Sequence, residues 1–332
     1  MDRNLSSPKL EIQNLKVSFS TSKGKLVAVK GINFCLNPGE TLALVGESGC
    51  GKTVSALSIL RLLPEPPAEI LSGKIFFSGE DLLSLDIKAL QNLRGRSISM
   101  IFQDPMTSLN PVLTVGEQII ETLLRHTTMS RQEAMKRSGD LLRQVEIFSP
   151  EEKLQYYPHQ LSGGMRQRIM IAMALACSPK ILIADEPTTA LDVLIQAQIL
   201  ELLKNLKKET GMSILIITHD LGVVSEIAQR VLVMYAGEIV ESGPTQSLLE
   251  KPFHPYTKGL ISSIPKLGSK KESGGRLEEI SGSVPSLDQR PSGCPFHPRC
   301  SWVMETCKTQ NPQLRQLDNQ RQVSCHLDSE SL

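Results

Sequence analysis

The stretch Gly46–Thr53, GESGCGKT, decides the fold class of this chain because it fits the phosphate-binding P-loop pattern G-x-x-x-x-G-K-[ST]. The apolar run Thr41–Val45 before it is suited to a buried strand. Val54–Leu63 after it has helix-compatible residues and stops at Pro64. The pattern requires a strand, a glycine-rich turn and a helix N-terminus, and all three are indicated here. The alternative is a glycine turn that precedes Lys-Thr by chance, and such a turn would not have this context. The sequence therefore predicts an α/β fold that binds a nucleoside triphosphate.

The chemistry of such a loop assigns a role to most of its residues. Its glycines let backbone N–H groups turn inward, and these donors hold phosphate oxygens together with the positive end of the helix dipole. We expect Lys52 to reach the β- and γ-phosphates and the Thr53 hydroxyl to contact Mg²⁺. The predicted nucleotide contacts in this stretch are Gly46, Ser48, Gly49, Cys50, Gly51, Lys52, Thr53 and Val54. ATP and Mg²⁺ are thus the first predicted ligands.

The composition limits the other partners and the location. The 332 residues suffice for one large or two smaller domains, and 36 Lys and Arg against 35 Asp and Glu give no sign of a nucleic-acid partner. A 4% aromatic content also argues against a base-stacking surface. The longest apolar run, Ile169–Cys177, falls short of the roughly 18 residues of a membrane span, and residues 1–13 lack the apolar segment of a signal peptide. We expect a cytosolic protein that reaches a membrane through a partner.

Polar residues follow two further predicted strands. Gln103 comes directly after the probable strand Ile98–Phe102, where it can touch a metal ion or its water. The apolar run from Ile181 ends in Asp185 and Glu186, and buried strands rarely end in paired acids without a charge partner because desolvation penalises both. Asp185 fits the Mg²⁺ position of P-loop proteins, and Glu186 fits a general base or a water-orienting group. The alternative is a pair of solvated acids that cap the strand.

A second glycine-containing stretch, Leu161–Arg168 (LSGGMRQR), opens a long predicted helix. Ser162 is suited to be its N-cap, and the two glycines that follow expose backbone donors, so the helix start could bind a second anion or simply be a capped end without a ligand. Further along, Asp192 can cap the next helix, and the predicted strand Ser213–Thr218 delivers His219 to its carboxyl end. Ligands of open α/β sheets bind at such ends.

With these motifs in this order, residues 1–250 resemble the ATP-binding cassette (ABC) ATPase domain, whose signature is LSGG. The resemblance implies a RecA-like P-loop core with an antiparallel β part and an inserted helical subdomain at residues 84–165. It also implies that two such domains bind two ATP molecules head to tail. Each P-loop is then paired with the signature of the opposite domain.

The resemblance also implies roles for individual residues. Glu186 is expected to be the catalytic carboxylate and His219 the γ-phosphate switch, while Thr53, Gln103 and Asp185 serve Mg²⁺ and water. The residues expected to reach ATP across the dimer are Ser162, Gly163, Gly164 and Gln167, with Asp192 in the segment Ala190-Leu191-Asp192 that resembles the D-loop. Phe19 is the candidate for stacking on adenine. Thr21 or a neighbour is the alternative, and a core role for Phe19 is left open.

Residues 102–111, 251–257 and 276–285 resemble corresponding stretches of the dipeptide/oligopeptide importer ATPases. Nickel-importer relatives share the first motif but usually lack a long cysteine-bearing tail, so a peptide is favoured and nickel or another small solute is the alternative. A soluble ABC ATPase acting on nucleic acid or ribosomes is disfavoured, because the chain has one cassette and no sustained heptads.

The importer resemblance implies several partners. They are two transmembrane permease subunits, a second ABC ATPase subunit that is a paralogue or a copy of this one, and an extracytoplasmic peptide-binding protein. The implied location is the cytoplasmic face of the bacterial inner membrane, to which the chain is bound peripherally.

The predicted C-terminal extension, residues 251–332, contains four cysteines spaced C-x5-C-x6-C-x17-C: Cys294, Cys300, Cys307 and Cys325. In a cytosolic protein such a group indicates metal binding before disulfides. Structural zinc usually takes tighter pairs, so a [4Fe–4S] cluster, which the family resemblance also implies, is favoured over Zn²⁺ and over free thiols. Lys266–Gly275, rich in Lys, Ser and Gly, is predicted to be flexible.

Overall fold

The computed structural model describes residues 9–189, 191–263 and 280–328. The chain divides into two compact units. One, here called the 81–217 unit, consists mainly of Asp81–Ile217, and the other, here called the P-loop unit, combines Leu10–Cys35, Thr41–Glu80 and Thr218–Leu332. The predicted flexible stretch, residues 266–275, lies outside the described residues. The domain boundaries predicted at residue 250 and at residues 84–165 stay predictions.

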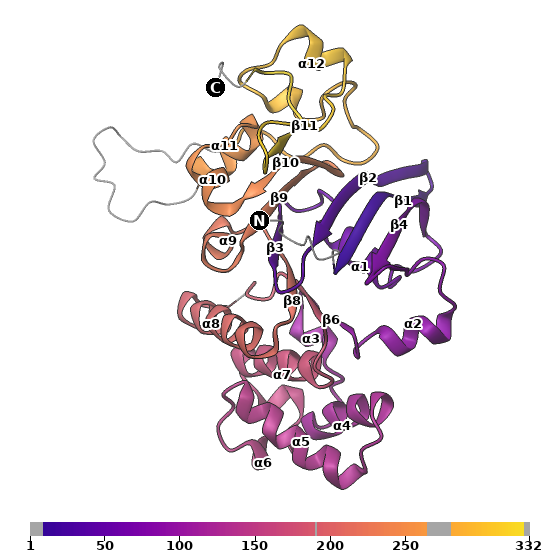
Figure 1. The fold of residues 1–332 in the computed structure, drawn as a ribbon, viewed down its shortest axis with the longest axis vertical. Coiled ribbons are helices and arrows are strands. Elements are labelled where there is room, and N and C mark those ends of the chain that lie inside the picture. The colour runs from indigo at the N-terminus through magenta and orange to yellow at the C-terminus, as the bar shows by residue number, and fades with distance from the viewer. Residues whose placement is uncertain (1–8, 190, 264–279, 329–332) are drawn as a thin grey trace, which may run out of the picture. The chain divides into compact units, whose positions relative to one another are not determined.

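Three parallel strands form the buried centre of the 81–217 unit (Figure 1): β6 (Ile98–Ile101), β7 (Ile181–Asp185) and β8 (Ser213–Thr218). Every residue of β7 and β8 is buried. Such near-continuous apolar runs are typical of parallel strands that are covered on both faces. The three strands agree with the sequence prediction, and because they are parallel they end at the same edge of the sheet.

The rest of this unit is mainly helical. Its helices are α2 (Ile87–Leu93), α3 (Pro105–Ser108), α4 (Val115–His126), α5 (Arg131–Gln144), α6 (Pro150–Lys153), the 3₁₀ turn η1 (Pro158–Gln160), α7 (Gly163–Leu175) and α8 (Val193–Thr210). Within this group α4, α5 and α7 contact one another, and α6 contacts α5 (Figure 1). None of the helices in the described parts of the chain has both the length and the apolar character that crossing a bilayer requires.

The ends of α8 follow the sequence signals. The Asp192 side chain accepts a hydrogen bond from the Ile195 backbone N–H at 2.9 Å, so it caps the helix as predicted. Gly211, with φ of 70°, ends the helix in the left-handed conformation that glycine adopts at low cost. Between these ends Ile199, Leu202 and Leu206 are buried and belong to the apolar face of the helix.

The P-loop unit contains strands in two sheets. In the first, β2 (Gly24–Leu36), β1 (Leu10–Thr21) and β4 (Ala68–Phe77) lie in that order, and β1 pairs antiparallel with β4. A short strand, β5 (Glu80–Asp81), follows β4 in the chain. Apolar residues alternate over residues 10–17 and 27–36, a pattern typical of strands, and this pattern covers most of β1 and β2, whereas β4 has no such clean alternation.

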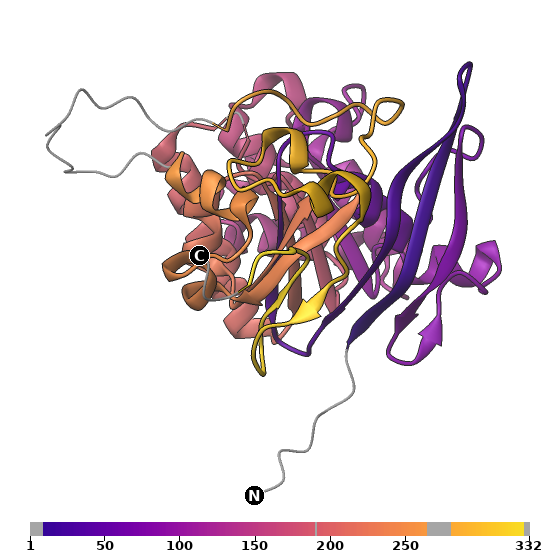
Figure 2. The same cartoon turned by 90° about the horizontal axis from the view of Figure 1, so that it is seen from above.

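In the second sheet β3 (Thr41–Val45) pairs parallel with β9 (Arg230–Tyr235), and β9 forms a hairpin with β10 (Glu238–Pro244). The hairpin turn is Ala236-Gly237, with φ of 46° and 85°. Two short C-terminal strands then extend this sheet beside β10 (Figure 2): β12 (Gln322–Val323) and β11 (Arg315–Gln316). The helices of the unit are α1 (Lys52–Ile59), α9 (Leu221–Ile227), α10 (Thr245–Glu250), α11 (Pro255–Ser262), the 3₁₀ turn η2 (His297–Arg299) and α12 (Glu305–Thr309).

A buried ion pair attaches the C-terminal segment to β10. The guanidinium of Arg321 lies 3.2 Å from the carboxylate of Glu241, and their side chains are 7% and 0% exposed. Glu241 also accepts hydrogen bonds from the backbone N–H groups of Phe253 and His254, both at 2.9 Å. Arg321 in turn stacks 4.4 Å from the centre of the Phe253 ring. The carboxylate is therefore fully compensated inside the protein.

Replacing Arg321 by alanine should leave the Glu241 carboxylate buried without its cation. We expect a loss of about 3–5 kcal/mol in the free energy of unfolding, measured by urea denaturation of the whole chain. The matched control is Arg143→Ala, because Arg143 pairs with Asp140 at the surface with 53% of its side chain exposed. An exposed pair contributes about 0.2–1 kcal/mol. Equal losses in the two variants would contradict the importance of the buried pair.

Candidate functional site

The predicted phosphate-binding loop connects β3 to α1 within the P-loop unit, and its shape requires glycine. Gly46 has φ of 156° and Gly51 has φ of 110°. A Cβ on Gly46 would lie 2.2 Å from the backbone oxygen of Met234, and a Cβ on Gly51 would lie 2.8 Å from the Met234 Cε and 3.2 Å from the Ala28 oxygen. The backbone of the loop thus packs directly on β2 and β9, and side chains at these positions are excluded.

Lys52 lies inside the curve of this loop. Its ammonium donates to the backbone oxygens of Gly46 at 2.7 Å and Glu47 at 3.0 Å, and only 5% of the residue is exposed. The ammonium is therefore held by neutral carbonyls and can be presented to an anion without leaving the loop. Ser48 and Gly49 at the tip are exposed.

The remaining predicted contacts of the loop lie at its helical end. Thr53 and Val54 are half-buried in the first turn of α1, which begins at Lys52 rather than at Val54 and ends at Ile59 rather than at Leu63. Arg61 adopts a positive φ of 48°, which no helix continues. Burial raises the pKa of the Cys50 thiol, so Cys50 is neutral and acts through packing beside Gly46.

Phe19, the candidate for adenine stacking, lies on β1 opposite Ala68 and is half-buried. His219, also in the P-loop unit, is exposed between the end of β8 and the start of α9. The next residue, Asp220, caps α9 by accepting a hydrogen bond from the Gly222 backbone N–H at 2.7 Å. The imidazole of His219 thus lies directly before the capped start of α9.

In the 81–217 unit the structure brings Gln103 and Glu186 together. The Gln103 amide Nε2 donates to the Glu186 Oε2 at 3.1 Å, and the Thr189 hydroxyl donates to the same oxygen at 2.8 Å. Glu186 has a positive φ of 46°, and its backbone N–H donates to the Ile217 oxygen at 2.8 Å. Asp185, directly before it, is 1% exposed. Two donors thus orient the Glu186 carboxylate, and a carboxylate held in this way can accept a proton from a water molecule or orient that water molecule.

The signature stretch begins α7 in the same unit. The Ser162 hydroxyl accepts a hydrogen bond from the Met165 backbone N–H at 3.3 Å, which confirms the predicted N-cap. Ser162 and Gly163 are exposed, whereas a Cβ on Gly164 would lie 3.1 Å from the Ile195 Cγ2. Gln167 is only 2% exposed, and its Nε2 has no hydrogen-bond partner among the described residues. The exposed helix start is suited to an anion, and residue 190 of the predicted D-loop is outside the described residues.

The prediction of a [4Fe–4S] cluster is wrong. No group of three or more His, Cys, Asp or Glu among the described residues could hold a metal ion, and Cys294, Cys300, Cys307 and Cys325 are all free. Burial, with a smaller contribution from the neighbouring cysteines, raises the pKa of the Cys294 thiol to about 11. The zinc alternative has no site among these residues either. The spacing of the four cysteines along the sequence gave no information on the arrangement of their sulfurs in space, and the structure shows no ligand set among the described residues.

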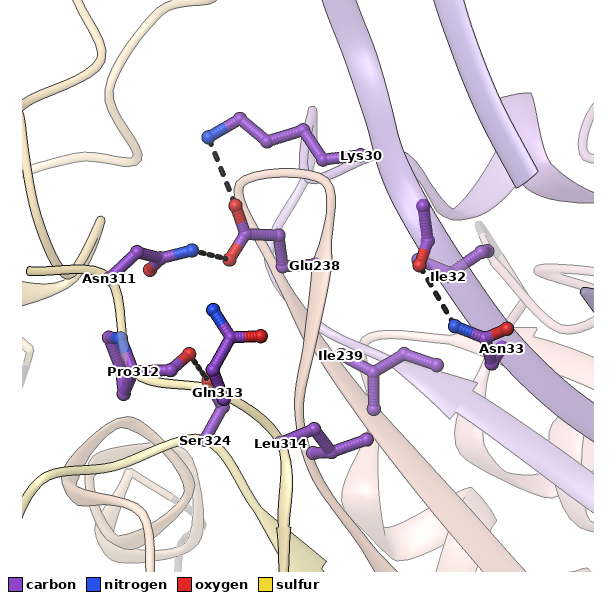
Figure 3. A pocket seen from close by; sticks show the side chains of 11 residues that line it. Lys30, Ile32, Asn33, Glu238, Ile239, Asn311, Pro312, Gln313, Leu314 and Ser324 are labelled. Carbon is purple, nitrogen blue, oxygen red and sulfur yellow. Dashed lines mark hydrogen bonds and ion pairs between the residues drawn. The ribbon is translucent and has the colours of Figure 1, made fainter. Parts of the chain in front are cut away.

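A cavity of about 440 Å³ elsewhere in the P-loop unit is lined by none of the predicted site residues (Figure 3). Its one carboxylate, Glu238, forms an ion pair with Lys30 at 3.0 Å and accepts a hydrogen bond from the Asn311 amide at 3.0 Å. Because these charges are already matched, the cavity gives no indication of a charged ligand.

Sequence reasoning missed two residues that touch the phosphate-binding loop. Tyr256 and Arg299 contact Glu47 from positions 209 and 252 residues further along the chain. Tyr256 lies in the stretch 251–257, which resembles the importer ATPases but carries no pattern that indicates this contact, and no signal in the sequence marks Arg299.

Comparisons with known proteins agree with the ABC resemblance. A model of the family described as "ABC transporter" matches residues 29–189, and a model of the "Oligopeptide/dipeptide transporter, C-terminal region" matches residues 240–307. The chain is 52% identical to the dipeptide transport ATP-binding protein DppD of Bacillus subtilis (strain 168), with 97% of this chain and 95% of the relative covered. It is 50% identical to the oligopeptide transport ATP-binding protein AppD of the same organism, with 97% of each covered.

A solved structure of the ATP-binding cassette MJ0796, dimeric in a post-hydrolysis state and bound to ADP and Pi, is also similar. It matches with a TM-score of 0.64 and 29% identity, covering 71% of this chain and 98% of that chain. The predicted cassette fold, with its RecA-like P-loop core, is thereby confirmed. Given identity of this extent over nearly the whole length, the chain belongs to the ABC transporter family, as an ATP-binding cassette ATPase with the oligopeptide/dipeptide transporter C-terminal region.

Proposed function

We propose that this ABC ATPase hydrolyses ATP to drive the import of dipeptides or oligopeptides through a membrane permease. The observation that carries the proposal is the match of residues 240–307 to the peptide-transporter C-terminal region, on a chain about half identical to DppD and AppD over nearly their whole lengths. The names of these relatives describe dipeptide and oligopeptide transport. The chain's own substrate class is inferred from them.

We assign phosphate binding to the loop Gly46–Thr53, with the exception of the negatively charged Glu47 side chain. The inward position of the Lys52 ammonium and the side-chain-free backbone at Gly46 and Gly51 support this role, because phosphate oxygens need closely spaced donors. Ser48 and Gly49 are exposed and accessible to the ligand. Phe19, on β1 of the same unit, is the proposed adenine-stacking residue.

Mg²⁺ is the proposed metal of the ATP site. The Thr53 hydroxyl, the Gln103 amide oxygen and the Asp185 carboxylate are hard oxygen donors of the kind that Mg²⁺ prefers, so the residues fit the ion. When bound with ATP it neutralises charge on the phosphates. Glu186 then acts as the base that accepts a proton from the attacking water, a role supported by its hydrogen bonds from Gln103 and Thr189. His219 is proposed to contact the γ-phosphate.

We propose that the active form is a pair of cassettes in which the α7 helix start of one protomer meets the nucleotide of the other. The exposed backbone at Ser162 and Gly163 supports this role, and Gly164 and Asp192 are assigned to the same interface. The burial of Gln167 limits its part to supporting the helix unless the helix start rearranges. The second cassette is a paralogue or another copy of this chain.

The proposed partners are two transmembrane permease subunits and, acting through them, an extracytoplasmic peptide-binding protein. The chain is then bound peripherally at the cytoplasmic face of the bacterial inner membrane. The test is to purify the chain with its membrane partners, reconstitute the complex in proteoliposomes and measure ATP-dependent uptake of a labelled dipeptide and of Ni²⁺. Uptake of the peptide supports the proposal, and uptake of Ni²⁺ alone contradicts it.

Replacing Glu186 by glutamine keeps the size and one hydrogen-bonding oxygen of the side chain but removes the base. We expect ATP hydrolysis, measured as phosphate release, to fall by about 10²–10⁴-fold while ATP binding persists. Glu209→Gln, an exposed residue near the end of α8, is the matched control and should retain the parent rate. Hydrolysis at the parent rate by the Glu186→Gln variant would contradict the assignment.

Replacing Lys52 by alanine should weaken ATP binding itself, because a charge-assisted hydrogen bond to phosphate is lost. We expect the dissociation constant, measured by titration with a fluorescent ATP analogue, to rise by roughly 10–150-fold. Lys88→Ala, an exposed lysine on α2, serves as the control and should bind like the parent. If both variants bind the nucleotide equally well, Gly46–Thr53 is not the phosphate site.

A further inference from the structure

Glu47 places a carboxylate within the phosphate-binding loop, where the ligand is itself a polyanion. Its side chain is 27% exposed, so solvent screens its charge only in part. An uncompensated negative charge at this position would repel a triphosphate bound by the neighbouring backbone donors. The loop therefore requires a cation that neutralises Glu47 without competing for the nucleotide.

Arg299, from the C-terminal region, meets this requirement. Its Nη1 lies 2.8 Å from the Glu47 Oε2 and its Nη2 lies 3.1 Å from the Glu47 Oε1, so the two side chains form a bidentate pair. Only 7% of the Arg299 side chain is exposed. Bidentate guanidinium–carboxylate pairs are among the stronger hydrogen-bonded contacts and also fix the orientation of the carboxylate.

The position of Arg299 is itself fixed by the surrounding chain. Its Nε donates to the Ser281 oxygen at 2.9 Å, and its Nη2 donates to the oxygens of Ile280 and Gly282 at 3.3 and 3.2 Å. The guanidinium carbon lies 6.0 Å from the centre of the Phe296 ring. Because its donors are directed to several fixed acceptors, the guanidinium has little freedom to turn toward another anion.

Tyr256 holds the backbone of the same residue. Its hydroxyl accepts a hydrogen bond from the Glu47 backbone N–H at 2.8 Å. The Tyr256 ring is completely buried, 4.7 Å from the Tyr235 ring and 5.5 Å from the Phe296 ring. The backbone carbonyl oxygen of Glu47 accepts a hydrogen bond from the Lys52 ammonium at 3.0 Å. Glu47 is therefore bonded both to Tyr256 and to the lysine of the loop.

We propose that Arg299 and Tyr256 are positioning residues for nucleotide binding: they fix Glu47 and cancel its charge, so that the C-terminal region sets the affinity of the phosphate-binding loop for ATP. This inference rests on the proposed role of Gly46–Thr53 in binding phosphate. The alternative is that the Glu47–Arg299 pair only attaches the C-terminal region to the loop. In that case its removal would change stability without a specific effect on ATP.

The test measures the dissociation constant of a non-hydrolysable Mg–ATP analogue by calorimetry, using the whole chain and the variants Arg299→Ala, Glu47→Gln and the double variant. We expect Arg299→Ala to weaken binding on the order of tenfold, with a smaller defect at high salt, because a bare carboxylate repels the phosphates. Glu47→Gln should bind nearly like the parent, and the double variant should bind like Glu47→Gln. If the pair served only to attach the C-terminal region, the additional Glu47→Gln change would not restore the affinity for the nucleotide that Arg299→Ala had lowered.

Two further variants complete the design. Tyr256→Phe keeps the packed ring but leaves the Glu47 N–H without its acceptor, so a smaller loss of affinity is expected. Arg143→Ala, at an exposed arginine, should bind like the parent. Thermal unfolding without nucleotide shows whether each variant is folded.

Parent-like affinity of a folded Arg299→Ala variant would overturn the inference, and so would a double variant as weak as Arg299→Ala. The Lys52→Ala variant separates this failure from that of the underlying site. If it also binds like the parent, the assignment of the phosphate site fails rather than the role of Arg299 and Tyr256.

Discussion

The predicted phosphate-binding loop depends on the close packing of its backbone, without side chains, against a neighbouring strand. At Gly46 a single added carbon would lie 2.2 Å from the Met234 oxygen, well inside any allowed contact distance. The loop can therefore follow this path only without side chains at its two packed glycines. Lys52 adds the positive charge that the loop itself supplies, and its ammonium is kept in place by the backbone carbonyls of Gly46 and Glu47.

The C-terminal region is joined to this arrangement by two glutamate–arginine pairs of low exposure. Arg321 compensates Glu241 on β10, and Arg299 compensates Glu47 in the loop. A buried pair contributes little compared with a well-packed apolar substitute, but removing one partner is costly because a charge is left in a poorly solvated position. In the described residues, these two ion pairs join the C-terminal region to β10 and to the phosphate-binding loop, and no metal site formed by its cysteines is present there.

Much of the fold could be predicted because local signals were strong. The apolar runs gave β3, β7 and β8, and Asp192 and Gly211 marked both ends of α8. The strand β4 was missed because its residues mix buried and exposed positions without clean alternation, and β11 and β12 are too short to carry a pattern. The cysteine spacing suggested a cluster because spacing along the chain does not report whether sulfurs meet in space.

The residues of the candidate site were likewise predictable only in part. Motifs identified the loop, Gln103 and the two acids at the end of β7, and the structure adds that Gln103 and Thr189 donate to the same oxygen of Glu186. The contacts of Arg299 and Tyr256 with Glu47 could not be predicted, because they join residues more than 200 positions apart and depend on the tertiary fold.

Amide hydrogen exchange of the whole chain with and without Mg–ATP tests the central assignment most directly. If the backbone of residues 46–53 binds the phosphates, exchange at Gly49–Thr53 should slow markedly when the nucleotide is bound, since those N–H groups gain acceptors. Binding of ATP with unchanged exchange in this loop, and with slowing confined to other parts of the chain, would contradict the account.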